Sequence, residues 1–180
     1  MTTQEKNGIT EGVIWKQLLI FFFPILVGSF FQQLYNTVDS VIVGQFVGKE
    51  ALSSVGGSAG QIISLVVGFF TGVSTGATVI ISQYFGAGKK EEIEESLHTA
   101  YAFALVGGLV LGIAGIVFAP QMLLWMNTPE ELIAESVLYV RVYFSGLIFI
   151  FIYNMGAAIL RAVGDSKRPL YYLIVCSVVN

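Results

Sequence analysis

Long uncharged stretches alternate along this chain with short polar segments. No charged residue occurs from Leu18 to Phe31, and none from Ala51 to Gly88. Apolar stretches of this length predict transmembrane helices, which need ~20 residues to cross a bilayer. We predict a polar tail over residues 1–13 and a transmembrane domain over 14–180, with helices at about 14–44, 51–85, 92–118, 129–163 and 168–180.

The overall composition agrees with a membrane protein. Hydrophobic residues make up 55% of the chain and charged residues 12%, whereas a soluble domain carries about 25% charged residues. A single cysteine and a single histidine exclude an internal disulfide and a Cys- or His-rich metal site. Without a Walker-type loop or a nucleophile–base pair, we predict no enzyme and no cofactor. The few scattered basic residues predict no nucleic-acid partner.

A polar stripe runs along the first predicted helix. Gln32, Tyr35, Asn36 and Asp39 recur at steps of three and four residues, which return to one helical face. A carboxylate within hydrocarbon costs roughly 3 kcal/mol on insertion scales unless it faces a cavity or a partner. We therefore expect the stripe to face the bundle interior, where Asp39 meets water, an ion or a substrate. The alternative is that Asp39 only joins two helices by hydrogen bonds.

Five further residues carry structural or cavity predictions. Tyr153 and Asn154 interrupt an apolar run, so we expect them to face the bundle interior. Pro24 shares the face of the polar stripe and predicts a bend, either a static kink or a hinge. Gly68 and Gly72 belong to a repeat of small residues at every fourth position, a spacing that favours close helix packing.

The distribution of basic residues predicts the orientation in the membrane. If the five helices cross alternately, the amino-terminal tail and the loops at 86–96 and 161–169 lie on one side. Seven of the nine Lys and Arg residues belong to that side: Lys6, Lys16, Lys89, Lys90, Arg161, Lys167 and Arg168. The positive-inside rule then places the amino terminus in the cytoplasm.

Three stretches of the chain resemble one transporter family. QQLYNTVDSVIVGQFVG, around Asp39, resembles the first helix of the multidrug and toxic compound extrusion (MATE) transporters. IISQYFGAGKKEE and ILRAVGDSKRPLYYLI resemble two cytoplasmic loops of the same half. The resemblance implies an all-α polytopic transmembrane helix bundle, here a partial amino-terminal six-helix lobe of a twelve-helix transporter. Residues Leu170 to Asn180 are too few to cross a bilayer, so we expect a fragment that lacks the carboxy-terminal lobe.

The resemblance also implies a function. MATE transporters are antiporters that export organic, often cationic, drugs or metabolites in exchange for H⁺ or Na⁺. The expected location is the plasma membrane of a bacterium, with the lipid bilayer and small organic substrates as partners. By position, Asp39 matches the family's ion-coupling carboxylate and Asn180 its helix-5 asparagine. From the stripe we add Asn36 to the coupling group, and Gln32 and Tyr35 to the substrate cavity.

Two other functions fit parts of the pattern. A lipid-linked saccharide flippase or polysaccharide exporter of related fold would need several cations to hold a diphosphate lipid, whereas one acid and at most one arginine are expected to be buried here. A non-transporting membrane scaffold or receptor subunit would need no buried acid. A flux assay in vesicles separates that scaffold from a transporter.

Overall fold

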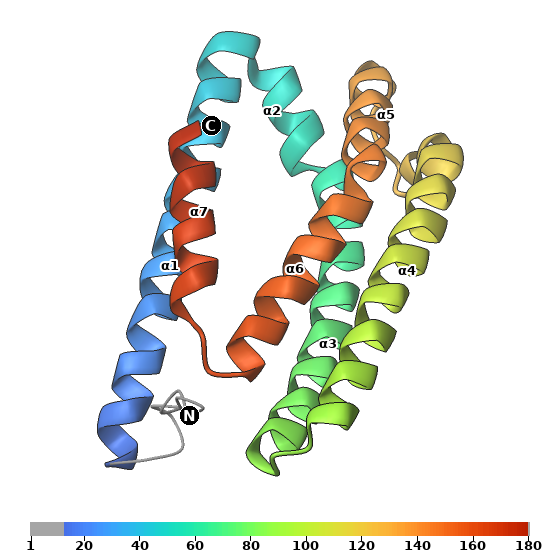
Figure 1. The fold of residues 1–180 in the computed structure, drawn as a ribbon. Helices are drawn as coiled ribbons and strands as arrows, with labels where there is room; N and C mark the ends of the chain where they lie inside the picture. Colours follow the sequence, from blue (N-terminus) through green and yellow to red (C-terminus); the bar gives the residue numbers. More distant parts are fainter. Residues whose placement is uncertain (1–12, 180) are drawn as a thin grey trace.

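The computed structural model describes residues 13–179 and is helical throughout its length (Figure 1). The prediction of an all-α membrane bundle is confirmed: three helical spans are long and apolar enough to cross a bilayer, and α5 and α6 together add a fourth if the bent pair counts as one span. The described elements are α1 (Ile14–Ile42), the π-helical turn η1 (Val43–Val47), α2 (Lys49–Gly56), α3 (Ser58–Gly86), α4 (Lys90–Trp125), α5 (Glu130–Ser145), α6 (Leu147–Ala162) and α7 (Lys167–Val179).

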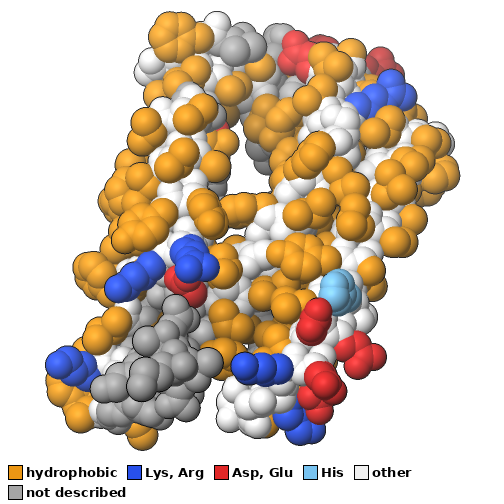
Figure 2. Space-filling model, viewed as in Figure 1, with side chains coloured by type: hydrophobic (Ala, Val, Ile, Leu, Met, Phe, Trp, Pro, Cys, Tyr) orange, Lys and Arg blue, Asp and Glu red, His pale blue; other side chains and the backbone are white. Residues whose placement is uncertain are grey.

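The helices form two groups. Helices α3 to α6 pack together around a common apolar core that includes Phe70, Leu123, Val140 and Phe151. Helices α1 and α7 pack side by side, and α2 connects α1 to the larger group (Figure 1). Figure 2 shows an opening between the two groups. The arrangement leaves the inner side of α1 facing a hollow.

Glycines on α4 allow the closest helix contacts in the core. A Cβ added at Gly108 would lie 2.9 Å from the Cα of Ile148 on α6. A Cβ at Gly115 would overlap the ring of Phe144 on α5, and one at Gly107 would meet the ring of Phe70. Small residues are what lets helices approach closely in a membrane, where no hydrophobic effect drives them together.

Within the described part of the chain, the repeat of small residues on the second predicted helix does not make the close packing that we predicted for it. Gly68 and Gly72 are exposed on α3, and a Cβ at either would have no neighbouring atom within 4 Å. Within residues 13–179, the close packing that we predicted for them is made by α4 instead. A four-residue repeat allows a close contact, but the contact also requires a partner helix on that face.

The predicted helix at 51–85 is divided at Gly57, where φ is −81° and ψ is −131°. A Cβ at Gly57 would lie 2.5 Å from the carbonyl oxygen of Ser53, and one at Gly60 would lie 2.6 Å from that of Val55. Both distances are too short for a side chain, so the break depends on glycine at both positions. The result is a short α2 and a long α3.

The predicted helix at 129–163 is also divided. It begins at Glu130 as α5 and continues after Gly146 as α6, with a bend of 50° between the two. Ser145 and Gly146 lie at this bend, and a Gly/Ser pair is a recognised cause of a sharp helix kink. The bend tilts α6 across the bundle toward α7 (Figure 1).

Helix α4 continues beyond the predicted end at about residue 118. It passes through Pro120 and ends at Trp125. Proline has no backbone N–H, so Pro120 leaves the carbonyl of Ile116, one turn earlier, without its usual helical donor. Arg141 on α5 supplies a donor: its Nε lies 3.2 Å from that oxygen. This bond gives Arg141 a structural role between α4 and α5.

We expect Arg141→Leu to lower the thermal midpoint of the full-length protein by several degrees. A backbone carbonyl that loses its donor within a membrane-spanning helix costs about 1–3 kcal/mol. Replacing Pro120 with Ala restores the N–H, so Arg141→Leu should cost less in a Pro120→Ala background than alone. A double-mutant cycle in detergent measures the difference. Equal costs in both backgrounds would contradict the pairing.

Candidate functional site

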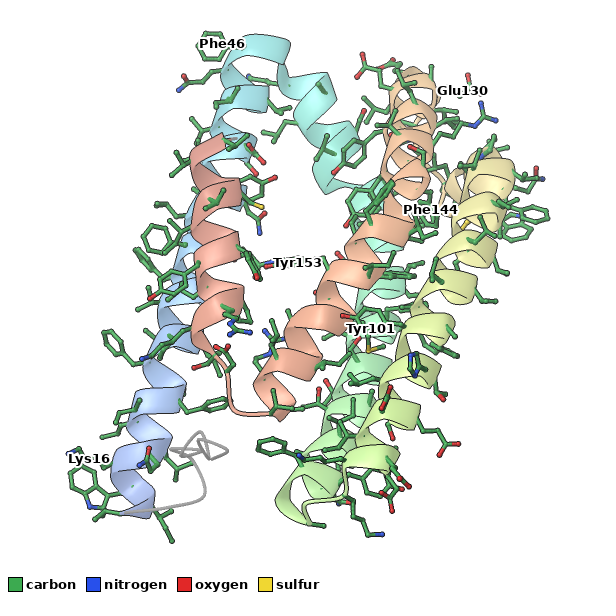
Figure 3. The ribbon with its side chains drawn as sticks, in the orientation of Figure 1. Lys16, Phe46, Tyr101, Glu130, Phe144 and Tyr153 are labelled. Atoms are coloured by element: carbon green, nitrogen blue, oxygen red, sulfur yellow. The ribbon has the colours of Figure 1, made fainter. Side chains whose placement is uncertain are left out.

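A cavity of about 160 Å³ lies between α1, α6 and α7. Helix α1 contributes Pro24, Gly28 and Gln32, and α6 contributes Asn154 and Arg161. Tyr153 also lines it and lies between α6 and α7 (Figure 3). The remaining lining residues are Ile25, Ser29, Ala157, Ser166, Pro169, Leu170 and Leu173. The amide, phenol and guanidinium groups make this cavity polar although it lies within an apolar bundle.

Two local features place α7 against this cavity. Gly28 is buried, and a Cβ there would lie 3.6 Å from the side chain of Leu170 on α7. The carboxylate of Asp165 accepts hydrogen bonds from the backbone N–H groups of Lys167 and Arg168, each at 3.1 Å, and so caps the start of α7. Its other oxygen pairs with the Arg168 side chain at 3.1 Å.

A second cavity, of about 370 Å³, adjoins the first. Its α3 side carries the hydroxyl residues Thr71, Ser74, Thr75, Thr78 and Ser82. Asn154 and Arg161 line both cavities, so the two meet at these side chains. The hydroxyl of Thr75 donates to the carbonyl of Thr71 at 2.8 Å, as hydroxyls commonly do in membrane helices. The hydroxyl oxygen still has acceptor capacity toward the cavity.

Asp39 is half-buried near the other end of α1. Tyr35, one turn earlier on the same helix, places its hydroxyl close enough to interact with this carboxylate. Tyr139 on α5 lies within electrostatic reach of the same carboxylate, and Tyr143 lies within reach of Tyr139 and Tyr35. The centres of the Tyr139 and Tyr143 rings are 6.4 Å apart. Asp39 therefore lies in the neighbourhood of phenol groups from two helices.

Helix α7 connects the level of Asp39 with the cavity below it. Cys176 on α7 lies within electrostatic reach of Tyr35 on α1 and of Tyr153 on α6. Tyr153 in turn lies within electrostatic reach of Arg161. Polar groups thus follow one another along the inner side of α1, α6 and α7, from Asp39 to Arg161. Asn180 lies outside the described residues.

The structure brings together some of the predicted site residues and leaves others apart. Pro24, Gln32, Tyr153 and Asn154 line one cavity, and Tyr35 contacts Asp39. Pro24 lies inside an uninterrupted α1. Asn36 is exposed and lines none of the cavities described above, and Gly68 and Gly72 lie away from them on α3.

Sequence reasoning missed Arg161 and Tyr139. We had counted Arg161 only as a cytoplasmic charge, although it lies two helical turns after Asn154 and so shares its face. Tyr139 carried no sequence signal for the site, because its proximity to Asp39 depends on how α5 packs. Within residues 13–179, no group of three or more His, Cys, Asp or Glu side chains could hold a metal ion.

Comparisons with known proteins identify relatives of this chain. The profile of the MatE family matches residues 24–180. The chain is 32% identical over its whole length to the probable multidrug resistance protein YoeA of Bacillus subtilis, of which it covers 38%. It is 33% identical, over 95% of its length, to the probable multidrug resistance protein YpnP of the same organism, of which it again covers 38%. The chain thus spans little more than a third of these relatives.

The fold is also that of a solved transporter. A MOP superfamily transporter from Pyrococcus furiosus superposes with a TM-score of 0.89 at 24% identity. The alignment covers 99% of this chain and 39% of that protein. At this level of identity the likeness concerns the fold alone.

Proposed function

This chain belongs to the MatE family, and from that premise we propose that its protein exports small organic molecules, many of them cationic, in exchange for H⁺ or Na⁺. The observation that carries the proposal is the half-buried carboxylate of Asp39 on the inner side of α1, with the phenols of Tyr35 and Tyr139 within electrostatic reach. An acid within a membrane helix marks an ion or substrate pathway by default.

Asp39 is the proposed coupling group. A carboxyl group can bind one proton, or it can bind Na⁺ together with amide and backbone oxygens. We propose Asn36 and Asn180 as sources of such oxygens; Asn180 follows Cys176 by four residues, the spacing of one helical face. The coupling ion and a cationic substrate would then compete for one negative charge. Competition of this kind makes binding of one promote release of the other, which is the requirement for antiport.

The cavity beside Pro24 is the proposed substrate route. Gln32, Tyr153 and Asn154 offer hydrogen-bonding groups, and Tyr35 lies between them and Asp39. Proline removes one helical hydrogen bond, so a change in the bend of α1 at Pro24 would cost less than elsewhere in the helix. We propose that such bending alters the cavity during transport.

The proposed location is the plasma membrane of a bacterial cell, with the amino terminus in the cytoplasm. The motivating observation is the excess of Lys and Arg in the tail, the 86–96 loop and the 161–169 loop. A cysteine introduced at Gly88 in the full-length protein, with Cys176 replaced by Ser, should react with an impermeant maleimide only from the cytoplasmic side. Labelling from outside would reverse the orientation.

Ethidium efflux by the full-length protein tests the function. Proteoliposomes that contain the purified protein should move ethidium when a proton gradient or a Na⁺ gradient is imposed, and should stop when an ionophore collapses that gradient. Vesicles without protein provide the baseline. Ethidium movement that needs neither gradient would contradict antiport, and no movement above baseline would contradict export of organic cations.

A further inference from the structure

Arg161 occupies an unusual position for a cation at a helix end. It lies in the last turn of α6 and is half-buried. Besides the two cavities described above, it lines a third cavity of about 380 Å³. This cavity lies between the start of α1 and the end of α3. Arg161 therefore lines three cavities. A surface arginine that only contributes to the charge of a loop would not be expected at such a junction.

Arg161 has no carboxylate partner within residues 13–179. The described ion pairs there join Lys89 with Glu92 and Arg168 with Asp165. Asp165, the acid nearest to Arg161 in the chain, is already occupied by the Arg168 side chain and two backbone N–H groups. Removing a cation from water without a partner is costly, since its hydration is not replaced.

The other groups of the first cavity are neutral and can form hydrogen bonds. Gln32 and Asn154 each carry an amide, Tyr153 carries a phenol, and Ser29 and Ser166 carry hydroxyls. The amide nitrogen of Asn154 donates to the carbonyl of Ile150 at 2.8 Å, which leaves its amide oxygen and second N–H. Within residues 13–179, the lining of this cavity supplies one positive charge and several donors, and no competing negative charge.

We propose that Arg161 is an anion-binding subsite that takes the carboxylate of an organic anion or zwitterion. The planar guanidinium presents two parallel N–H groups that match the two oxygens of a carboxylate, so it discriminates better than a lysine would. The subsite rests on the proposed export function and narrows its substrate class. The level of the cavity, marked by Gly28, lies about 16 Å from Asp39 along α1, at 1.5 Å per residue. The route thus carries a positive group at one end and a negative group at the other, which suits dipolar substrates.

A matched pair of dyes tests this subsite in the full-length protein. Rhodamine B carries a carboxylate and a delocalised cation, whereas its ethyl ester carries only the cation. Binding to the purified protein is measured by fluorescence polarisation in detergent without anionic lipid. Arg161→Gln should weaken rhodamine B binding roughly ten- to hundredfold, as loss of a charge-assisted bond does. Binding of the ester should stay within about twofold.

Two further variants keep the test interpretable. Arg161→Lys should give an intermediate affinity for rhodamine B, because it keeps the charge and loses the planar fork. Arg168→Gln removes a cation that is already paired with Asp165 and should change neither dye. Size-exclusion profiles report whether each variant is folded.

The subsite and the export function can fail separately. If Arg161→Gln and Arg161→Lys fold and bind both dyes as the wild type does, or weaken both dyes equally, the subsite is wrong even though ethidium export continues. If the wild-type protein exports no ethidium and binds neither dye, the proposed function is wrong and the subsite fails with it.

Discussion

Asp39→Asn in the full-length protein is expected to reduce gradient-driven ethidium efflux to the level of empty vesicles while leaving the protein folded. Asparagine has nearly the same shape as aspartate, and its amide oxygen can still accept a hydrogen bond from a nearby phenol such as that of Tyr35. It cannot take up and release a proton near neutral pH, and it does not neutralise Na⁺. The variant therefore removes the coupling chemistry and preserves the packing.

Two control variants make the result specific to Asp39. Glu135→Gln is the same acid-to-amide change at an exposed position on α5 and should leave efflux unchanged. Asp39→Glu keeps the charge but moves it by one methylene group, so it should retain a fraction of the rate. Efflux at the wild-type rate by Asp39→Asn would show that Asp39 is a packing residue and that coupling occurs elsewhere.

Gly115→Ala is expected to destabilise the protein, whereas Gly72→Ala should be neutral or stabilising. Both changes add one methyl group to a helix, and both gain about 0.5–1 kcal/mol in helix propensity. At Gly72 the methyl group meets open space, but at Gly115 it would overlap the ring of Phe144. Overpacking of this kind costs about 1–3 kcal/mol, so the two variants should differ by roughly that amount.

Thermal unfolding of both variants in the same detergent measures the difference. A smaller side chain at position 144 should relieve the overlap, so Gly115→Ala should cost less in a Phe144→Leu background than alone. Similar midpoints for Gly115→Ala and Gly72→Ala would mean that α4 and α5 are not in close contact at this level. Destabilisation by Gly72→Ala would instead assign close packing to the glycines of α3.

Periodicity along the chain was enough to predict the helical class and the polar face of the first helix. Both are local properties: an apolar stretch must hydrogen-bond its own backbone in lipid, which selects the helix. Steps of three and four residues then place Tyr35 and Asp39 one turn apart on any helix. For the same reason, the apolar stretches located the main helices before any packing was known.

Contacts between distant residues decided the rest. Pro120 reads as a helix end, yet α4 continues because Arg141, 25 residues later, satisfies the freed carbonyl. Glycines mark possible close contacts on both α3 and α4. Within the described chain, the glycine face of α4 meets other helices, whereas Gly68 and Gly72 on α3 meet none.

The residues of the candidate site also divide into those placed by local helical geometry and those placed by tertiary packing. The sequence alone placed Asp39 on a polar face, because helical geometry relates each residue to its near neighbours. The sequence could not place Tyr139 near Asp39, or Arg161 among three cavities. Those positions depend on the bend of 50° between α5 and α6 and on how α7 packs against α1. A helix direction after a bend is determined by the surfaces that it packs against, and those surfaces exist only once the bundle has assembled.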